Sequence, residues 1–235
     1  RGLGDVYKRQ RWVKLGQPHF DQIHRIAKRS PFYDQRPWDP ASATRPLRFC
    51  FMGTTRANKG LEVLTRAIPL LAPEVRRRCH ITIHAAGFDW SFRKRLSQYP
   101  EVSVYGAYDL YQLIAKGAGG GEYDVGILPH IWLENSPLVL LENLHAGKFV
   151  LSSRLGGPVD WMVEPKGENL GNGLLFAGGD EVALAECMRR CIVGDVTIPS
   201  AREVHEVSLA GLQSYPAHIA EFERLYRDII HRARG

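Results

Sequence analysis

The chain has 235 residues, of which 44% are hydrophobic and 24% are charged. This balance is typical of a globular protein with one large domain or two small ones, and it excludes a disordered, collagen-like or disulfide-rich miniprotein. No apolar run approaches the roughly 20 residues of a membrane-spanning helix, and the opening RGLGDVYKRQ lacks the apolar stretch of a secretory signal.

The net charge is +6, but the basic residues are unevenly spread. Residues 1–48 hold 11 Lys or Arg against 4 Asp or Glu, whereas residues 49–235 hold 20 against 21. The basic excess therefore belongs to the N-terminal segment, where a solvated charged surface is its plainest explanation and a membrane-proximal or interdomain surface is the alternative. Nucleic-acid binding is not expected of the rest of the chain.

The first 46 residues show no clear fold pattern. Residues 1–10 resemble a translated sequencing adapter and are treated as an artefactual leader, so the chain is expected to be part of a larger protein. A short helix is predicted at residues 21–28. The segment SPFYDQRPWDPASATRP that follows is typical of either an interdomain linker or a surface strap.

From residue 47 onward, short apolar runs alternate with segments of helical period. Strands are predicted at 47–52, 80–85, 102–105, 123–128 and 149–152, and a shorter one at 174–176. Helices are predicted between them, at 61–71, 110–114 and 137–146. Nearly continuous apolar strands alternating with helices indicate an α/β fold with a buried parallel sheet.

The C-terminal part is predicted to be helical. Asp180 is the expected N-cap of a helix that ends near Ile192. A last helix is predicted over about 202–232, with a kink or restart at Pro216, because proline cannot continue a helix without losing a hydrogen bond.

Apolar residues recur at helical spacing in that last helix, and they predict a face that packs back toward a missing part of the protein: Ile219, Phe222, Leu225, Tyr226 and Ile229. In this chain alone we expect part of the stripe, and some surface around Trp12 and Trp38, to be uncovered and to favour self-association.

Four cysteines occur, at positions with no CxxC pair and no zinc spacing: Cys50, Cys79, Cys187 and Cys191. They are expected to pack as small hydrophobic thiols in a reducing cytosolic setting, with no disulfide and no structural metal.

The first candidate site is the segment GTTRANKG, at residues 53–60, between the first strand and its helix. Ligands of parallel α/β sheets bind at the carboxyl ends of the strands, where a glycine lets a phosphate approach and Lys59 suits its charge. The segment is neither a Walker A loop nor GxGxxG. A plain glycine turn with an exposed lysine explains it as well.

The second candidate is LPHIWLENSPLVLLEN, which follows the fourth strand. Ser136 and Pro137 are predicted to be the N-cap and first residue of a helix whose amino end points into the same crevice as Lys59. Glu142 lies among apolar neighbours in this helix, so it is expected to accept hydrogen bonds from donors such as ribose hydroxyls. The alternatives are an ion pair and a position at a solvated edge of the helix. Glu134 is a ligand contact or a loop carboxylate in water, and Trp132 beside it is expected to be a packing residue.

The third candidate is SSRLGGPVD, at residues 152–160 after the fifth strand. Paired glycines there allow either close backbone approach to a ligand, at Gly157 for example, or a plain tight turn.

Together these segments resemble the C-terminal domain of family 4 retaining glycosyltransferases, which have the GT-B architecture. FMGTTRANKGLEVL is similar to their strand, glycine, lysine-glycine and helix signature, and Glu134 and Glu142 reproduce their E-x7-E spacing. SSRLGGPVD and GNGLLFAGGD are similar to their double-glycine turn and last half-lobe. The resemblance covers residues 46–232 and implies a Rossmann-like parallel sheet flanked by helices, with a long C-terminal helix.

The resemblance also implies the domain boundaries. Residues 11–46 would be the remnant of the N-terminal domain and its linker, and 47–200 the domain that binds a nucleotide sugar. Residues 201–235 would be the helix that packs toward the missing domain.

The resemblance implies the following roles for residues of this chain. Gly53 and Lys59 would meet the donor diphosphate, Glu134 the transferred sugar, and Glu142 the nucleotide ribose. Lys59 and Glu134 would be the catalytic residues, with the leaving phosphate itself as the base.

Further donor-binding positions are expected at Thr54, Arg56, Asn135, Ser136, Leu138 and Gly157. The chain departs from the family pattern at several positions. Thr54 stands where arginine is frequent, so that Arg56 either supplies a second cation or does not, and Pro137 lacks an amide donor. Asp160 stands where a glutamate is frequent, and His130 where a small hydroxyl residue is common.

The implied activity is retaining transfer of a sugar from a nucleotide diphosphate sugar to an acceptor hydroxyl, without a cofactor or metal. The acceptor, a carbohydrate or another hydroxyl compound, would bind through the missing N-terminal domain, so this chain alone is expected to be inactive. The implied location is cytoplasmic, with peripheral association of the full-length protein with a membrane as a further option. The alternative is a non-catalytic regulatory domain that binds a nucleotide or nucleotide sugar.

Overall fold

The computed structural model describes residues 18–87, 90–109, 111, 113, 123–210 and 215–234. They divide between two compact units, a large one that comprises Gln22–Ala210 and a small one built from the two ends of the chain, Arg1–Asp21 and Gly211–Gly235. The large unit carries the sheet.

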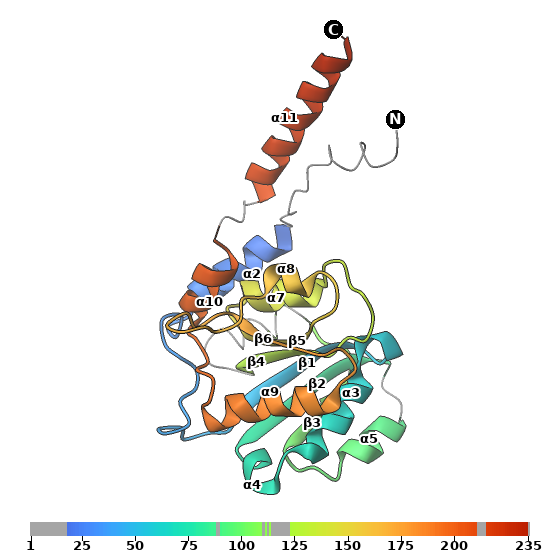
Figure 1. Cartoon of the computed structure of the whole chain (residues 1–235), viewed down its shortest axis with the longest axis vertical. Helices are drawn as coiled ribbons and strands as arrows, with labels where there is room; N and C mark the ends of the chain where they lie inside the picture. The colour runs from blue at the N-terminus through green and yellow to red at the C-terminus, as the bar shows by residue number, and fades with distance from the viewer. Residues whose placement is uncertain are drawn as a thin grey trace. The chain divides into compact units, whose positions relative to one another are not determined.

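The large unit contains a six-stranded parallel sheet in the order β3-β2-β1-β4-β5-β6 (Figure 1). Its strands are β1 (Leu47–Thr54), β2 (Cys79–Ala86), β3 (Val102–Tyr105), β4 (Val125–Leu128), β5 (Phe149–Ser153) and β6 (Gly173–Phe176). All six predicted strands are confirmed, with boundaries that move by two residues at most. Strands β2 and β3, which follow β1 in the chain, lie on one side of β1, and strands β4, β5 and β6 lie on its other side. The direction in which successive strands are added therefore reverses between β1 and β4.

Helices cover both faces of the sheet (Figure 1). One face carries α3 (Leu61–Ala67), α4 (Pro73–Arg76), α5 (Trp90–Leu96) and α9 (Glu181–Val193), and the other carries α7 (Leu138–His145), α8 (Pro158–Trp161) and α10 (Ala201–Ser208). This is the Rossmann-like α/β arrangement that the sequence predicts. Most of the helix predicted at 110–114 lies outside the described residues.

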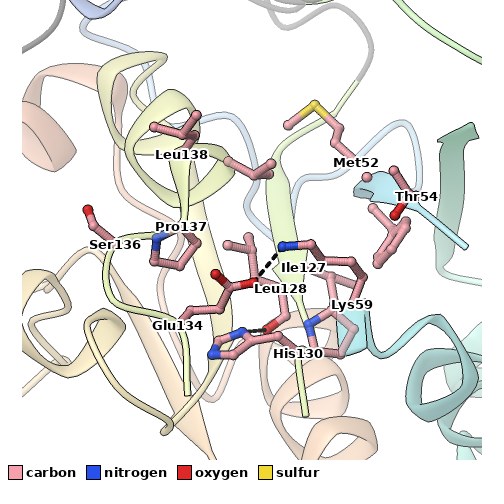
Figure 2. A pocket seen from close by; sticks show the side chains of 14 residues that line it. Met52, Thr54, Lys59, Ile127, Leu128, His130, Glu134, Ser136, Pro137 and Leu138 are labelled. Carbon is pink, nitrogen blue, oxygen red and sulfur yellow. Dashed lines mark hydrogen bonds and ion pairs between the residues drawn. The ribbon is translucent and has the colours of Figure 1, made fainter. Parts of the chain in front are cut away.

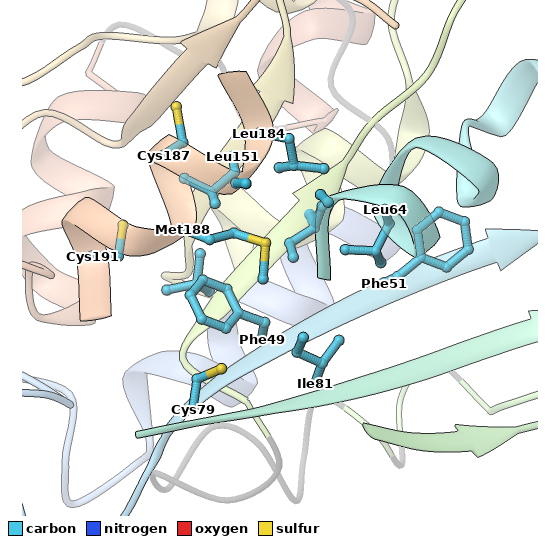
Figure 3. Close-up of a cluster of buried hydrophobic side chains, with 14 of the residues drawn as sticks. Phe49, Phe51, Leu64, Cys79, Ile81, Leu151, Leu184, Cys187, Met188 and Cys191 are labelled. Carbon is cyan, nitrogen blue, oxygen red and sulfur yellow. The ribbon is translucent and has the colours of Figure 1, made fainter. Parts of the chain in front are cut away.

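The main core lies between the sheet and helices α3 and α9. Alternate residues of β1 point to opposite faces, so Phe49 and Phe51 join this core while Cys50 and Met52 face the α7 side. Figure 3 shows Phe49 and Phe51 among side chains from β2, α3 and α9. All four cysteines are buried free thiols, as the sequence predicts, and three of them pack in this core: Cys79, Cys187 and Cys191.

The Pro-rich segment before β1 is a strap on the large unit rather than a free linker. Its Trp38 is only 6% exposed and belongs to the main core, so the prediction of uncovered surface around Trp38 is wrong. Arg45 and Arg48 both pair with the buried carboxylate of Asp124, at 2.7 and 3.0 Å. Burial would raise the pKa of Asp124, but hydrogen bonds from the two guanidinium groups hold it below its usual value.

The C-terminal helices begin and end largely as predicted. Asp180 caps α9 by accepting a hydrogen bond from the Ala183 amide at 2.8 Å. The predicted restart at Pro216 is confirmed, because α10 ends at Ser208 and α11 (Tyr215–Arg234) begins anew with Pro216 in its first turn. Proline at that place costs no helical hydrogen bond.

The small unit contains α11 and the first residues of α2 (Pro18–Lys28), a helix that continues into the large unit. Four residues of the predicted apolar stripe are exposed on α11: Ile219, Phe222, Tyr226 and Ile229. Trp12 lies outside the described residues. No helix of the described residues combines the length and hydropathy needed to cross a bilayer.

Candidate functional site

A pocket of about 350 Å³ opens at the carboxyl ends of β1 and β4. These are the two strands between which the strand order reverses, and open α/β sheets bind ligands in the crevice at such a point. The fold thus places the pocket where the sequence predicts a site.

The first wall of the pocket is the loop between β1 and α3. Gly60 ends it with a φ of 72°, and a Cβ at this position would lie 1.6 Å from the carbonyl oxygen of Pro129. The Ile131 amide donates a hydrogen bond to the Asn58 carbonyl at 3.0 Å. Gly60 is therefore required for the close contact between this loop and the loop that follows β4.

The second wall is the loop between β4 and α7, which forms hydrogen bonds with the loop after β5. Glu134 forms an isolated β-bridge with Gly156, and its carbonyl accepts a hydrogen bond from the Gly157 amide at 2.6 Å. A Cβ at Gly157 would lie 1.6 Å from the carbonyl oxygen of Asn135. The paired glycines thus make room for a neighbouring loop, a contact that the sequence analysis missed because it arises only when the chain is folded.

Lys59 and Glu134 meet across the pocket mouth. The Lys59 ammonium lies 2.5 Å from a Glu134 carboxylate oxygen, as Figure 2 shows. Partial burial would raise the pKa of Glu134, but hydrogen bonds from Lys59 and Trp132, together with the positive charge of Lys59, hold it below its usual value. Glu134 is therefore a carboxylate at neutral pH, beside a lysine whose side chain stays partly exposed.

Trp132 differs from its predicted packing role. Its side chain is 53% exposed, and the residues on either side of it, Ile131 and Leu133, are exposed as well.

His130 belongs to the pocket wall although sequence reasoning did not select it. It is buried, with Nδ1 3.2 Å from the Leu128 carbonyl oxygen (Figure 2). Its Nε2 lies 3.1 Å from the Leu155 carbonyl oxygen. No sequence pattern marked His130 as a pocket residue, because its contact with the Leu155 carbonyl joins two loops that are distant in sequence.

The first turn of α7 closes the pocket, although the helix begins one residue later than predicted. Pro137 is the N-cap, with a ψ of 120°, and its carbonyl accepts the first helical hydrogen bond from the Leu140 amide. The prediction of Ser136 as N-cap and Pro137 as first helical residue is therefore wrong. An extended ψ at Pro137 is incompatible with a helical residue.

Six of the ten predicted site residues line the pocket, and four do not. The six are Gly53, Thr54, Lys59, Glu134, Ser136 and Leu138. Arg56 and Asn135 are exposed and do not line the pocket. Gly157 does not line it either, but packs against the backbone of Glu134 and Asn135.

Glu142 does not line the pocket either, but lies one turn further along α7 than Leu138. It is 9% exposed, and burial raises its pKa to about 7. Tyr108 and Tyr123 lie near enough for the Glu142 charge to raise their own pKa values, after the larger effect of burial. Ionising this buried carboxyl group costs free energy in the unliganded protein, and hydrogen bonds from a ligand would reduce that cost.

A metal centre is not indicated by the described part of the chain. No group of three or more His, Cys, Asp or Glu side chains there is arranged to hold a metal ion. The pocket offers a cation, a carboxylate and the first turn of a helix, a set of groups suited to a phosphorylated ligand with hydroxyl groups.

Comparison with known families decides the assignment. Residues 46–193 match the family described as glycosyl transferases group 1. The chain belongs to this family. A search of curated proteins finds no match.

Solved glycosyltransferase structures share the fold of this glycosyltransferase group 1 chain at low sequence identity. An apo structure of the lipopolysaccharide outer core galactosyltransferase WaaB matches 71% of this chain and 45% of its own, with a TM-score of 0.58 and 17% identity. Anabaena HepE in complex with UDP and glucose matches 88% and 52%, with a TM-score of 0.59 and 18% identity. The catalytic domain of Arabidopsis thaliana starch synthase IV bound to ADP and acarbose matches 90% and 43%, with a TM-score of 0.56 and 18% identity.

These matches show the GT-B type of Rossmann-like fold. The chain spans about half the length of the solved structures it matches.

Proposed function

We propose that this chain is the donor-binding domain of a family 4 retaining glycosyltransferase. It binds a nucleotide diphosphate sugar in the β1–β4 pocket, and the complete enzyme transfers the sugar to an acceptor hydroxyl with retained configuration. The observation that carries the proposal is the Lys59–Glu134 pair at the mouth of that pocket, in a chain of the glycosyltransferase group 1 family. The HepE and starch synthase IV structures, which contain UDP and ADP, support the choice of donor.

Lys59 acts on the leaving group. Negative charge grows on the diphosphate as the bond to the sugar breaks, and a preorganised ammonium in a partly dry pocket stabilises that charge more than water does. The first turn of α7 adds the positive end of its dipole from the opposite wall. Because Lys59 pairs with Glu134 in the free protein, the diphosphate must compete with that carboxylate for the ammonium.

Glu134 and Glu142 act on hydroxyl groups. The Glu134 carboxylate faces the pocket and accepts hydrogen bonds from the transferred sugar. Glu142 accepts hydrogen bonds from the nucleotide ribose, which would replace part of the hydration that this buried carboxylate lacks.

The acceptor site belongs to parts of the protein beyond residues 22–210. In a two-lobed transferase both halves enclose the reactants, and their orientation supplies much of the rate. We therefore propose that this chain binds the donor weakly and does not transfer sugar by itself, that the reaction needs no cofactor, and that the enzyme works in the cytoplasm, free or at a membrane surface.

A thermal-shift screen with the diphosphates of uridine, guanosine and adenosine, and with their sugars, tests the proposal. One nucleotide series is expected to raise the melting temperature, because a ligand that binds only the folded state stabilises it. Lys59→Ala should then weaken diphosphate binding about tenfold or more in calorimetry, since a charge-assisted hydrogen bond is lost. Lys166→Ala, at an exposed lysine that does not line the pocket, is the matched control.

Two results would reject the proposal. One is the absence of stabilisation by any of these nucleotides at millimolar concentration, and the other is equal affinity of wild type and Lys59→Ala for the nucleotide that binds.

A further inference from the structure

A second pocket, of about 580 Å³, lies between α2 and α10, which are side by side in Figure 1. All of its lining residues belong to the large unit, and they come from three segments that are distant in sequence. Its polar lining consists of His24 and Lys28 of α2, Tyr33 of the strap before β1, and Arg202, His205 and Glu206 of α10. A cavity of this size can hold a small molecule.

This α2–α10 pocket is separate from the β1–β4 pocket, because the two lie at opposite ends of α7. Leu138, the first residue of α7, lines the β1–β4 pocket. His145, the last residue of α7, accepts a hydrogen bond at its carbonyl oxygen from Nε2 of His205, at 3.0 Å. A helix of eight residues is about 12 Å long. The α2–α10 pocket therefore lies away from the carboxyl ends of the strands.

The buried wall of the α2–α10 pocket is held in place through His205. Burial lowers the pKa of His205 to about 3, with a smaller contribution from His24, so the imidazole is neutral. Because its Nε2 donates to a carbonyl oxygen, its Nδ1 accepts the hydrogen bond from the Tyr33 hydroxyl at 2.8 Å. His24 stacks on the same ring, with centroids 4.3 Å apart. The wall is thus formed in the free protein, which lowers the entropic cost of binding a ligand.

Two cations and a carboxylate, all exposed, line the mouth of the α2–α10 pocket. Lys28 has no ion-pair partner within the described part of the chain. Arg202 is oriented by Asp34, at 2.5 Å, and by the ring of Tyr33, whose centroid lies 5.9 Å from the guanidinium carbon. Glu206, one turn further along α10, supplies the carboxylate.

These groups fit a ligand that carries both a phosphate and hydroxyl groups. Lysine and arginine bind phosphate through charge-assisted hydrogen bonds. A carboxylate only accepts hydrogen bonds, so Glu206 repels a bare phosphate and suits hydroxyl groups. We propose that the α2–α10 pocket is a second ligand site, which binds a phosphorylated sugar with its phosphate on Lys28 and Arg202 and its hydroxyl groups on Glu206. This site needs no nucleotide sugar and is independent of the proposed function.

Calorimetric titration of the chain with glucose 6-phosphate tests the inference. Lys28→Ala should weaken binding about tenfold, because a charge-assisted hydrogen bond is lost. Arg29→Ala is the matched control, since it removes the same charge from the next residue, which is exposed and does not line the pocket. Its affinity for glucose 6-phosphate should stay within about twofold of wild type.

Glu206→Gln separates recognition of the sugar from attraction of charge. The measured quantity is the ratio of the affinities for glucose 6-phosphate and for inorganic phosphate, in which the repulsion between Glu206 and the phosphate cancels. This ratio should fall about fivefold in Glu206→Gln, because a neutral amide forms weaker hydrogen bonds with hydroxyl groups than a carboxylate does. An unchanged ratio overturns the recognition of a sugar at this site.

Lys59→Ala distinguishes this proposal from the proposed function. It removes the cation of the β1–β4 pocket and should leave the affinity for glucose 6-phosphate within about twofold of wild type. Loss of binding in Lys59→Ala would place the sugar phosphate in the β1–β4 pocket and overturn the second site. The second site is also overturned if glucose 6-phosphate does not bind at millimolar concentration, or if wild type and Lys28→Ala bind it equally. A chain that binds glucose 6-phosphate as expected but no nucleotide would overturn the proposed function alone.

Discussion

Replacing Glu142 by glutamine should stabilise the free protein at neutral and alkaline pH. Burial raises the pKa of Glu142 from 4.5 to about 7, so the folded protein binds a proton there more tightly than the unfolded chain does. Between these two values the folded state loses stability as pH rises, because the carboxyl group must ionise in a buried place. Glutamine has nearly the same shape and does not ionise.

The magnitude follows from the two pKa values. The shift corresponds to about 3 kcal/mol at pH 8, and to less than about 1 kcal/mol at pH 5, where most of the ionisation penalty is absent. For a domain of this size, about 3 kcal/mol raises the melting temperature by roughly 6–12 °C. Because Glu142 retains some contact with solvent, the gain in free energy of unfolding and the rise in melting temperature should be at least about half of these values.

The assay is thermal or urea unfolding of wild type and Glu142→Gln from pH 5 to pH 8, without nucleotide. Glu62→Gln serves as a control of opposite sign, since hydrogen bonds from Arg95 hold the pKa of Glu62 below its usual value. That variant should lose stability by a nearly constant amount from pH 5 to pH 8, because this whole window lies above the pKa of Glu62 in both the folded and the unfolded chain. The reasoning is refuted if Glu142→Gln is no more stable than wild type at pH 8, or if its advantage does not change with pH.

Two further predictions concern the framework around the pocket. Gly157→Ala should destabilise the protein by about 1–3 kcal/mol and weaken donor binding, because its Cβ would lie 1.6 Å from a carbonyl oxygen of the Glu134 loop. Gly106→Ala, with nothing within 4 Å of the new Cβ, should be near neutral in the same melts. Asp124→Asn should cost about 3–5 kcal/mol in urea unfolding, because it leaves Arg45 and Arg48 without their buried anion. An Asp124→Asn midpoint within error of wild type would show that the three groups do not depend on one another.

The strands of this fold could be predicted from the sequence because both faces of the sheet are buried. Runs such as LRFCFM and FVLSS have to be almost wholly apolar, and turn residues bound them clearly. The position of the crevice could be predicted from the same strands, because the carboxyl ends of parallel strands meet at one edge of the sheet. Lys59, Glu134 and Ser136 were placed there from sequence, and all three line the pocket.

Features that depend on contacts between segments distant in the chain could not be predicted from the sequence. Trp38 stands in a Pro-rich segment whose composition indicates an exposed linker, yet it packs in the main core. The start of α7 was predicted one residue early because a Ser-Pro pair fits two helix starts equally well, and only the ψ of Pro137 separates them. Gly60 and Gly157 accommodate the backbone of loops that are distant in sequence, so no local pattern distinguishes them from turn glycines.

A crystal structure of the chain with the nucleotide sugar that gives the largest thermal shift tests the central claim most directly. The account predicts the diphosphate within about 3 Å of the Lys59 ammonium, the sugar hydroxyls on Glu134, and the ligand between the β1–α3 loop and the first turn of α7. A nucleotide sugar bound elsewhere on the domain, with the Lys59–Glu134 pair unchanged, would contradict it.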